Sequence, residues 1–146
     1  MPLLLRALRY AWAGPYTAVG VLLGVFILLF GGTWRPWRGT LEFGGGGFGR
    51  LLSHLPPPMR FSAMTLGHVI LGVDNFALAE LRPHEHVHVR QYERWGPLFV
   101  PAYLLSSLVQ LLRGRNPYRE NHFERQAFAL APARRYRGET LPPDRA

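Results

Sequence analysis

The chain contains no cysteine and no lysine, and it is short of acidic residues. Without cysteine, the protein can form no disulfide, no thiolate zinc site and no cysteine nucleophile. All seventeen basic residues are arginines and only nine acidic residues oppose them, so the formal net charge is +8. At 146 residues, the chain has room for one domain with a modest core.

The excess of arginine fits an anionic partner, either a nucleic acid or an anionic lipid surface. The chain has no recognition-helix or base-stacking pattern, and its arginines flank hydrophobic segments. The glycine-rich stretch at 44–47, which predicts a flexible loop, is not followed by the Lys-Ser/Thr pair of a phosphate-binding loop. We therefore expect membrane lipids as partners and expect no nucleic acid.

Charged residues are also missing from Ala11 to Gly32, a stretch dense in Leu, Val, Phe and Ile. Its length is enough to cross a bilayer as a helix. A secretory signal peptide is the alternative, but Phe30 and Trp34 crowd the small residues that cleavage would need. The sequence therefore predicts an uncleaved membrane anchor at 1–34, with aromatic residues near both membrane interfaces.

The most informative motif is an HExxH pentapeptide at 84–88. In a helix, residues four apart share a face, so His84 and His88 can bind one metal ion while Glu85 acts as general base on a water. Pro83 suits a first helical turn and Gly96-Pro97 a stop, which predicts a helix over 83–95. The alternative is a solvated, charge-rich helix whose histidines bind nothing.

Catalytic zinc needs a third protein ligand and an open position for water. The segment at 118–127 offers Glu120, His122 and Glu124. Asn121 and Glu124 have the spacing of a capping box that opens a helix reaching about Leu130. Glu124 can therefore either complete a His-His-Glu site or bond its own helix N-terminus, because one carboxylate cannot point both ways.

The runs HEHVHVRQYERWGP (84–97) and YRENHFERQA (118–127) together resemble small bacterial membrane proteins that look like minimal gluzincin metallopeptidases. The resemblance covers about 62–129. It implies a zincin-like core in which His84, His88 and Glu124 bind zinc and Glu85 is the catalytic base. His122 stands where proline is usual in this pattern, which leaves it as an alternative ligand or a transition-state donor.

Other parts of the expected domain follow from pattern and from this resemblance. Strands are predicted at 39–43 and within 61–73, and the latter could form a hairpin. Resemblance to zincins makes 65–71 the candidate edge strand for an extended peptide. Its residues are Thr65, Leu66, Gly67, His68, Val69, Ile70 and Leu71. His68 is expected to be a packed or surface histidine instead of a fourth ligand.

A donor to the reaction's oxyanion is also expected, and Tyr92, Tyr118, Arg119 and His122 are the candidates. A second apolar run at 97–112 is short for a membrane span. Were it to span, His88 and Glu124 would lie on opposite sides of a layer about 30 Å thick. A three-ligand site therefore requires this run to fold back or to lie in the membrane interface.

These observations predict an α+β protein with a membrane anchor (1–34), a zincin-like domain with an apolar helix at 97–112 (35–131) and a loose basic tail (132–146). We expect one zinc ion, although His-His-Glu ligation also suits other divalent metals. The predicted function is zinc-dependent hydrolysis of a peptide or membrane protein at the bacterial inner membrane. Fifteen arginines follow the first apolar stretch and two precede it, which favours a cytoplasmic catalytic part. The rival is a non-enzymatic membrane protein with a structural metal site or a degenerate motif.

Overall fold

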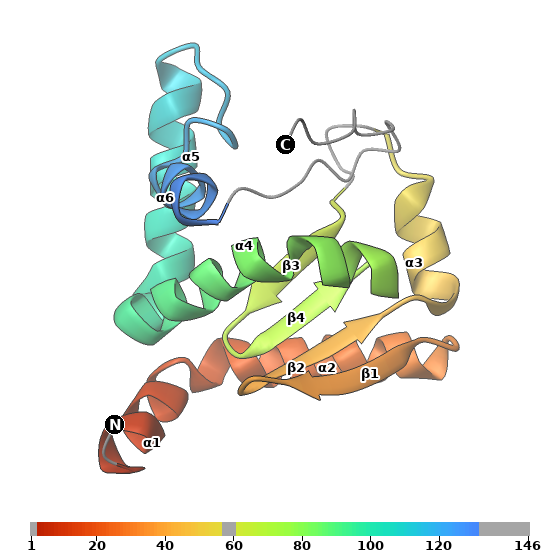
Figure 1. Cartoon of the computed structure of the whole chain (residues 1–146). Coiled ribbons are helices and arrows are strands. Elements are labelled where there is room, and N and C mark those ends of the chain that lie inside the picture. Colours follow the sequence, from red (N-terminus) through yellow and green to blue (C-terminus); the bar gives the residue numbers. More distant parts are fainter. Residues whose placement is uncertain (1–2, 57–60, 132–146) are drawn as a thin grey trace, which may run out of the picture.

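The computed structural model describes residues 3–56 and 61–131. Within them, helix α2 (Gly14–Leu29) covers one face of a four-stranded sheet and helix α4 (Asn75–Trp95) covers the other (Figure 1). The predicted α+β class is confirmed. The predicted tail at 132–146 and most of the triple-proline connector at 56–58 lie outside the described residues.

The sheet is mixed, with strand order β1-β2-β4-β3. Its strands are β1 (Thr33–Trp37), β2 (Thr40–Gly44), β3 (Ala63–Leu66) and β4 (Val69–Gly72). Strand β2 runs parallel to β4, and the other two pairs are antiparallel. The strand predicted at 39–43 and the hairpin predicted within 61–73 are confirmed. Strand β1 was not predicted, because its two tryptophans were assigned to the membrane interface.

Successive residues along each strand face opposite sides of the sheet, and both sides are packed against a helix. Phe43, Val69 and Leu71 pack with Ile27 of α2. On the opposite face, Ile70 packs with Leu78 and Val89 of α4. Thr65 pairs with Ile70 across β3 and β4, so its hydroxyl also faces α4. The strand register therefore decides which polar side chains reach the HExxH helix.

Helix α2 lies against the sheet through glycines. A Cβ added at Gly20 would lie 2.7 Å from Val69 Cβ, and one at Gly24 would lie 2.6 Å from the Phe43 ring. Such close contact makes α2 a layer of the fold that contains the sheet, on the N-terminal side of the boundary predicted after residue 34. The length and apolarity of this segment predict a membrane span, whereas the spacing of its glycines marks the face that packs on the sheet.

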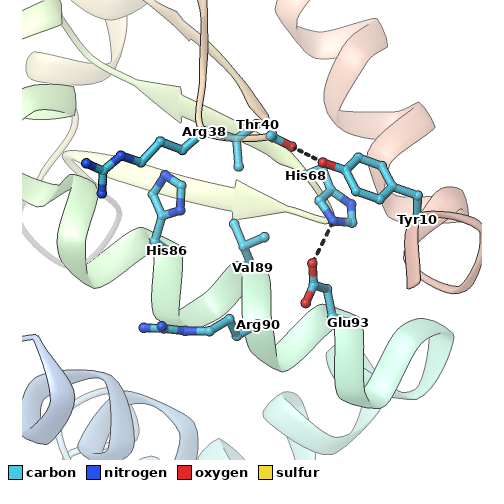
Figure 2. Close-up of a pocket in the computed structure, with 9 residues that line it drawn as sticks. Tyr10, Arg38, Thr40, His68, His86, Val89, Arg90 and Glu93 are labelled. Atoms are coloured by element: carbon cyan, nitrogen blue, oxygen red, sulfur yellow. Dashed lines mark hydrogen bonds and ion pairs between the residues drawn. The ribbon is translucent and has the colours of Figure 1, made fainter. Parts of the chain in front are cut away.

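Helix α1 (Leu3–Trp12) precedes α2 at an angle of 67°. Its Tyr10 hydroxyl donates to the Gly39 carbonyl over 2.7 Å, and its ring stacks on His68 with centroids 3.9 Å apart (Figure 2). The outward sides of α1 and α2 carry large exposed apolar residues. These are Leu3, Leu4, Leu5, Leu8, Trp12, Val19, Leu22, Leu23, Val25, Phe26 and Leu29.

Helix α4 is longer than the predicted 83–95, because it begins two turns earlier at Asn75. Asp74 caps it by accepting a hydrogen bond from the Ala77 amide over 2.7 Å. Pro83 therefore lies inside the helix, where proline removes one backbone hydrogen bond. Leu78 and Leu81, both buried, hold the first two turns against the core. The predicted end at Gly96 is confirmed.

The glycine-rich segment forms helix α3 (Gly46–Ser53) instead of the predicted flexible loop. Gly45 and Gly46 have φ angles of 82° and 68°, a region that favours glycine. Gly49 faces the backbone of Val73 so closely that a Cβ would collide with the carbonyl. These glycines therefore permit close packing at the end of the sheet.

The apolar run at 97–112 forms a short 3₁₀ turn, η2 (Gly96–Leu98), and helix α5 (Phe99–Leu112). The chain then reverses, and α6 (His122–Leu130) packs on both α5 and α4. The helical run from Asn75 to Leu112 contains a stretch apolar enough to cross a membrane, and α1 with α2 passes the same test as a bent pair. The polar, sheet-covering part of that run is α4, and its apolar part is α5.

Candidate metal centre

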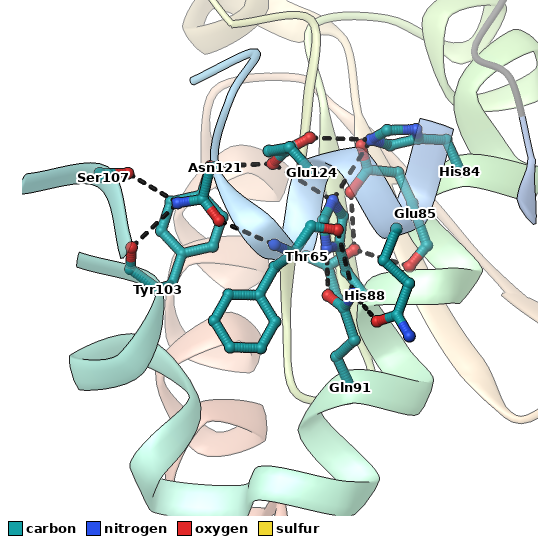
Figure 3. Close-up of polar contacts among 11 residues, drawn as sticks. Thr65, His84, Glu85, His88, Gln91, Tyr103, Ser107, Asn121 and Glu124 are labelled. Atoms are coloured by element: carbon teal, nitrogen blue, oxygen red, sulfur yellow. Dashed lines mark hydrogen bonds and ion pairs between the residues drawn. The ribbon is translucent and has the colours of Figure 1, made fainter. Parts of the chain in front are cut away.

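Two helices far apart in the sequence bring three ligand-type side chains together. His84 and His88 come from α4 and Glu124 from the first turn of α6 (Figure 3). Their ligand atoms all lie within 4.8 Å of one another. The His84 and His88 Nε2 atoms are 3.3 Å apart, and the Glu124 carboxylate oxygens lie 3.2 Å from His84 Nε2 and 3.4 Å from His88 Nε2.

Two of these separations have the length expected between ligands of one tetrahedral zinc ion. Ligand atoms that each lie 2.0–2.1 Å from the centre of a tetrahedron are roughly 3.3 Å from one another. The spacing of the two Nε2 atoms and that of His84 Nε2 from Glu124 Oε2 therefore match two edges of a zinc coordination tetrahedron, whereas His88 Nε2 approaches the other carboxylate oxygen, Oε1. In the described part of the chain no fourth His, Cys, Asp or Glu belongs to the group, so the fourth corner is free of such a protein ligand.

The ligands are buried and electrostatically coupled. His84, His88 and Glu124 are 3%, 7% and 4% exposed. Burial alone would raise the pKa of Glu124, but hydrogen bonds from His84 and His88 lower it to about 2. Burial alone would lower the pKa of His88, but the Glu124 carboxylate raises it to about 9. An anionic carboxylate between two imidazoles is thus set up to hold a cation, either a proton or a metal ion.

Gln91 fixes the orientation of His88. Its amide nitrogen donates to the Phe123 carbonyl over 3.1 Å and to Gln126 Oε1 over 2.8 Å, so its oxygen must face His88 Nδ1, 2.8 Å away. His88 Nδ1–H therefore donates to Gln91, and the proton on Nε2, beside Glu124, is the one that a metal ion would replace. A hydrogen-bonded second nitrogen of this kind is typical of metal-binding histidines.

Glu85 lies beside the three ligands and is held by the edge strand. The Thr65 hydroxyl of β3 donates to its carboxylate over 2.7 Å. At 6% exposed, Glu85 has little room to move. The predicted edge-strand residue Thr65 thus has a role that the sequence did not indicate, which is to position the predicted base.

Helix α5 holds α6 in place for Glu124. Asn121, which is fully buried, caps α6 by accepting from the Phe123 amide over 2.9 Å, and it donates to the Tyr103 carbonyl and to Ser107. The Tyr103 hydroxyl donates to Glu124 Oε1 over 2.8 Å. The Glu124 carboxylate therefore points to the histidines and to Tyr103. It does not cap the N-terminus of its own helix, which was the alternative role.

Tyr103 was not among the predicted donors. Tyr103 lies in the middle of an apolar run, where an aromatic residue is expected to pack in the core. Its hydroxyl has a partner because α6 brings Glu124 close to it. A polar pattern did exist on this helix, because Ser106 and Ser107 both bond to the start of α6. These two serines therefore form hydrogen bonds within the protein.

Several predicted site residues lie elsewhere. His122 is exposed and Glu120 faces Arg125 at 4.0 Å, so neither joins the ligand group. Tyr92 is buried against Tyr16 and Phe99. His68 is packed between Tyr10 and Glu93, as expected of a structural histidine.

The predicted substrate strand is only partly at an edge. Strand β3, which ends at Leu66, is the edge strand, whereas β4 lies between β2 and β3. Val69, Ile70 and Leu71 are therefore paired on both sides and offer no free backbone, and Gly67 and His68 form the turn between the strands. Of the predicted substrate strand, only Thr65 and Leu66 therefore lie in the edge strand.

Comparison of the chain with protein-family models, with curated proteins and with solved structures found no match.

Proposed function

We propose that this protein is a membrane-associated, zinc-dependent peptidase with a zincin-like catalytic centre. The observation that carries the proposal is the buried group of His84, His88 and Glu124, whose ligand atoms all lie within 4.8 Å of one another with no fourth acidic or histidine residue of the described chain in the group. The same ligand set also suits iron or another divalent metal, so zinc is the proposed ion and not an observed one.

Each residue of the centre has a place in such a reaction. His84, His88 and Glu124 would hold the zinc ion, which would supply Lewis acidity. Glu85 would act as general base on the water that adds to the peptide carbonyl and would pass the proton to the amine as the C–N bond breaks, while Thr65 holds the carboxylate in position. Tyr103 and Gln91 fix the orientation of Glu124 and His88.

The edge of the sheet provides a place for an extended substrate. Strand β3 has one free side, and Thr65 within it bonds directly to Glu85. A peptide that pairs with β3 by β-augmentation would therefore run beside the proposed base.

The apolar surface supports association with a membrane. Besides the outward residues of α1 and α2, helix α5 exposes five leucines away from α6. These are Leu104, Leu105, Leu108, Leu111 and Leu112. Because α2 is covered by the sheet on one side, we propose that its other side lies in the membrane interface, and the arginine distribution favours the cytoplasmic face.

The proposal is tested with detergent-purified protein supplied with zinc and a library of quenched fluorogenic peptides. We expect hydrolysis that a chelator abolishes and that Glu85→Gln lowers at least about 100-fold, the range for loss of a general base. Glu120→Gln makes the same chemical change at a partly exposed carboxylate outside the ligand group and should leave the rate unchanged. Equal rates in wild type and Glu85→Gln would contradict a peptidase.

One observation favours a second candidate, a structural metal site. All four central side chains are 3–7% exposed, so a substrate must displace part of the cover to reach them. In that case zinc would raise the unfolding temperature while Glu85→Gln would change neither metal binding nor any reaction. Zinc-dependent turnover by the wild type excludes this candidate.

A further inference from the structure

A second group of polar residues lies on the opposite side of α4 from the ligands. His86 is two residues from both His84 and His88, which places it about 160° around the helix from each. It lines a cavity of about 180 Å³ between α4, the N-terminal helix α1 and the turn that joins β1 to β2 (Figure 2). The metal centre does not use this cavity.

The cavity carries an excess of positive charge. Arg38 from the turn and Arg90 from α4 both line it, and both act electrostatically on His86 between them (Figure 2). Within the described residues, neither arginine has a carboxylate partner. The acidic residue in the lining, Glu93, is already engaged by His68 at 3.2 Å and by Arg9 at 3.4 Å. Two guanidinium groups are therefore left for an anion.

Two buried nitrogen atoms of this lining also lack partners in the described part of the chain. They are His86 Nε2 and His68 Nδ1, and His68 as a whole is 4% exposed. A buried polar atom without a hydrogen bond is costly and requires an explanation. A ligand with several acceptor oxygens could accept from His86 and from both arginines, and a hydroxyl on it could donate to His68 Nδ1.

Arg38 occupies a turn position at which arginine is unusual. Arg38 and Gly39 form the two-residue connection between β1 and β2, with φ angles of 43° and 88°. Positive φ at both positions is typical of a type I′ turn, in which asparagine followed by glycine is preferred. Arg38 is the one non-glycine residue with positive φ among those described. Strain of this kind often marks a residue kept for binding.

A second cavity of about 360 Å³ shares Tyr10, Arg38 and His68 with the first. Its other walls include Pro36, Trp37 and Leu41, so the positively charged cavity opens into an apolar one. The exposed leucines of α1 and the partly exposed Trp34 and Trp37 belong to the elements around this groove. A ligand with an anionic end and an apolar end would fill both parts.

We propose that this groove binds an anionic lipid, with the phosphate held by Arg38, Arg90 and His86 and the start of an acyl chain lying over Trp37 and Leu41. This site is independent of the metal centre, because it uses none of the proposed ligands. It gives the apolar outer surface a specific lipid contact in addition to general burial in the bilayer.

The test uses full-length protein in a non-ionic detergent and three probes: dioctanoyl phosphatidic acid, dioctanoyl phosphatidylcholine and inorganic phosphate. Binding is followed by the shift of the unfolding temperature with probe concentration. We expect phosphatidic acid to bind at least tenfold more tightly than either other probe. Arg38→Asn and Arg90→Gln should each weaken its binding at least tenfold, because each removes a charge-assisted contact.

Two controls separate binding from folding. Asparagine suits the turn better than arginine, so Arg38→Asn should unfold at the same or a higher temperature in the absence of lipid. Arg94→Gln makes the same change as Arg90→Gln one turn further along α4, outside the cavity lining, and should keep binding within twofold of wild type. Phosphate binding as tightly as phosphatidic acid would overturn the lipid part of the proposal. Equal binding by all variants would overturn the site.

Discussion

The role of Gln91 leads to a prediction that depends on the direction of one hydrogen bond. Gln91→Leu keeps the approximate size of the side chain but removes the oxygen that accepts from His88 Nδ1 over 2.8 Å. His88 is then free to place its proton on Nε2, which cannot bind a metal. Loss of such a partner usually lowers metal affinity 10- to 100-fold, or by about 1.4–2.8 kcal/mol.

Gln91→Glu is the matched control, because it keeps an acceptor for His88 but loses the donor to the Phe123 carbonyl. We expect it to retain zinc affinity near the wild-type value and to lower the free energy of unfolding. Both affinities can be measured by competition with a chromophoric zinc chelator. Zinc affinity of Gln91→Leu equal to wild type would refute the assigned tautomer and the role of Gln91.

Three further predictions concern packing, the helix and protons. Gly24→Val should lower the free energy of unfolding by about 1–3 kcal/mol, because the new side chain would collide with Phe43. Gly14→Ala, which has open space around it, should not lower it. Urea unfolding measures both variants. Pro83→Ala should raise the free energy of unfolding by about 2 kcal/mol. Proline inside a helix destabilises it by about 3 kcal/mol, and its restriction of the unfolded chain offsets up to about 1 kcal/mol of that. An unchanged free energy of unfolding would contradict an uninterrupted α4. In metal-free protein the pKa of His88 is raised from 6.5 to about 9, so its stabilisation is complete below pH 6.5 and is lost as pH rises through 9. Zinc must displace that proton, so its apparent affinity should rise with pH up to about 9, and calorimetry in buffers of different ionisation enthalpy should detect the proton released.

The helices that hold the ligands could be predicted from local signals. The four-residue spacing of His84 and His88 and the stop at Gly96 act within one helix, and the Asn121 cap acts within one turn. The start of α4 was missed because Pro83 is a common first-turn residue, and the apolar packing that carries the helix through it is a tertiary effect.

The parts that could not be predicted depend on contacts distant in sequence. Thr65 reaches Glu85 across 20 positions, and Tyr103 reaches Glu124 across 21. The choice of Glu124 over Glu120 and His122 depends on how α6 packs against α4 and α5. The docking of α2 on the sheet was marked only by Gly20 and Gly24, whose spacing places them on one helix face.

The metal content of detergent-purified protein, measured by mass spectrometry after zinc is supplied and excess removed, tests the central claim most directly. We predict one zinc ion per chain in wild type and in His122→Ala, and none or a small fraction in His84→Ala and Glu124→Ala. Wild type without zinc, or Glu124→Ala with as much zinc as wild type, would contradict the three-ligand centre.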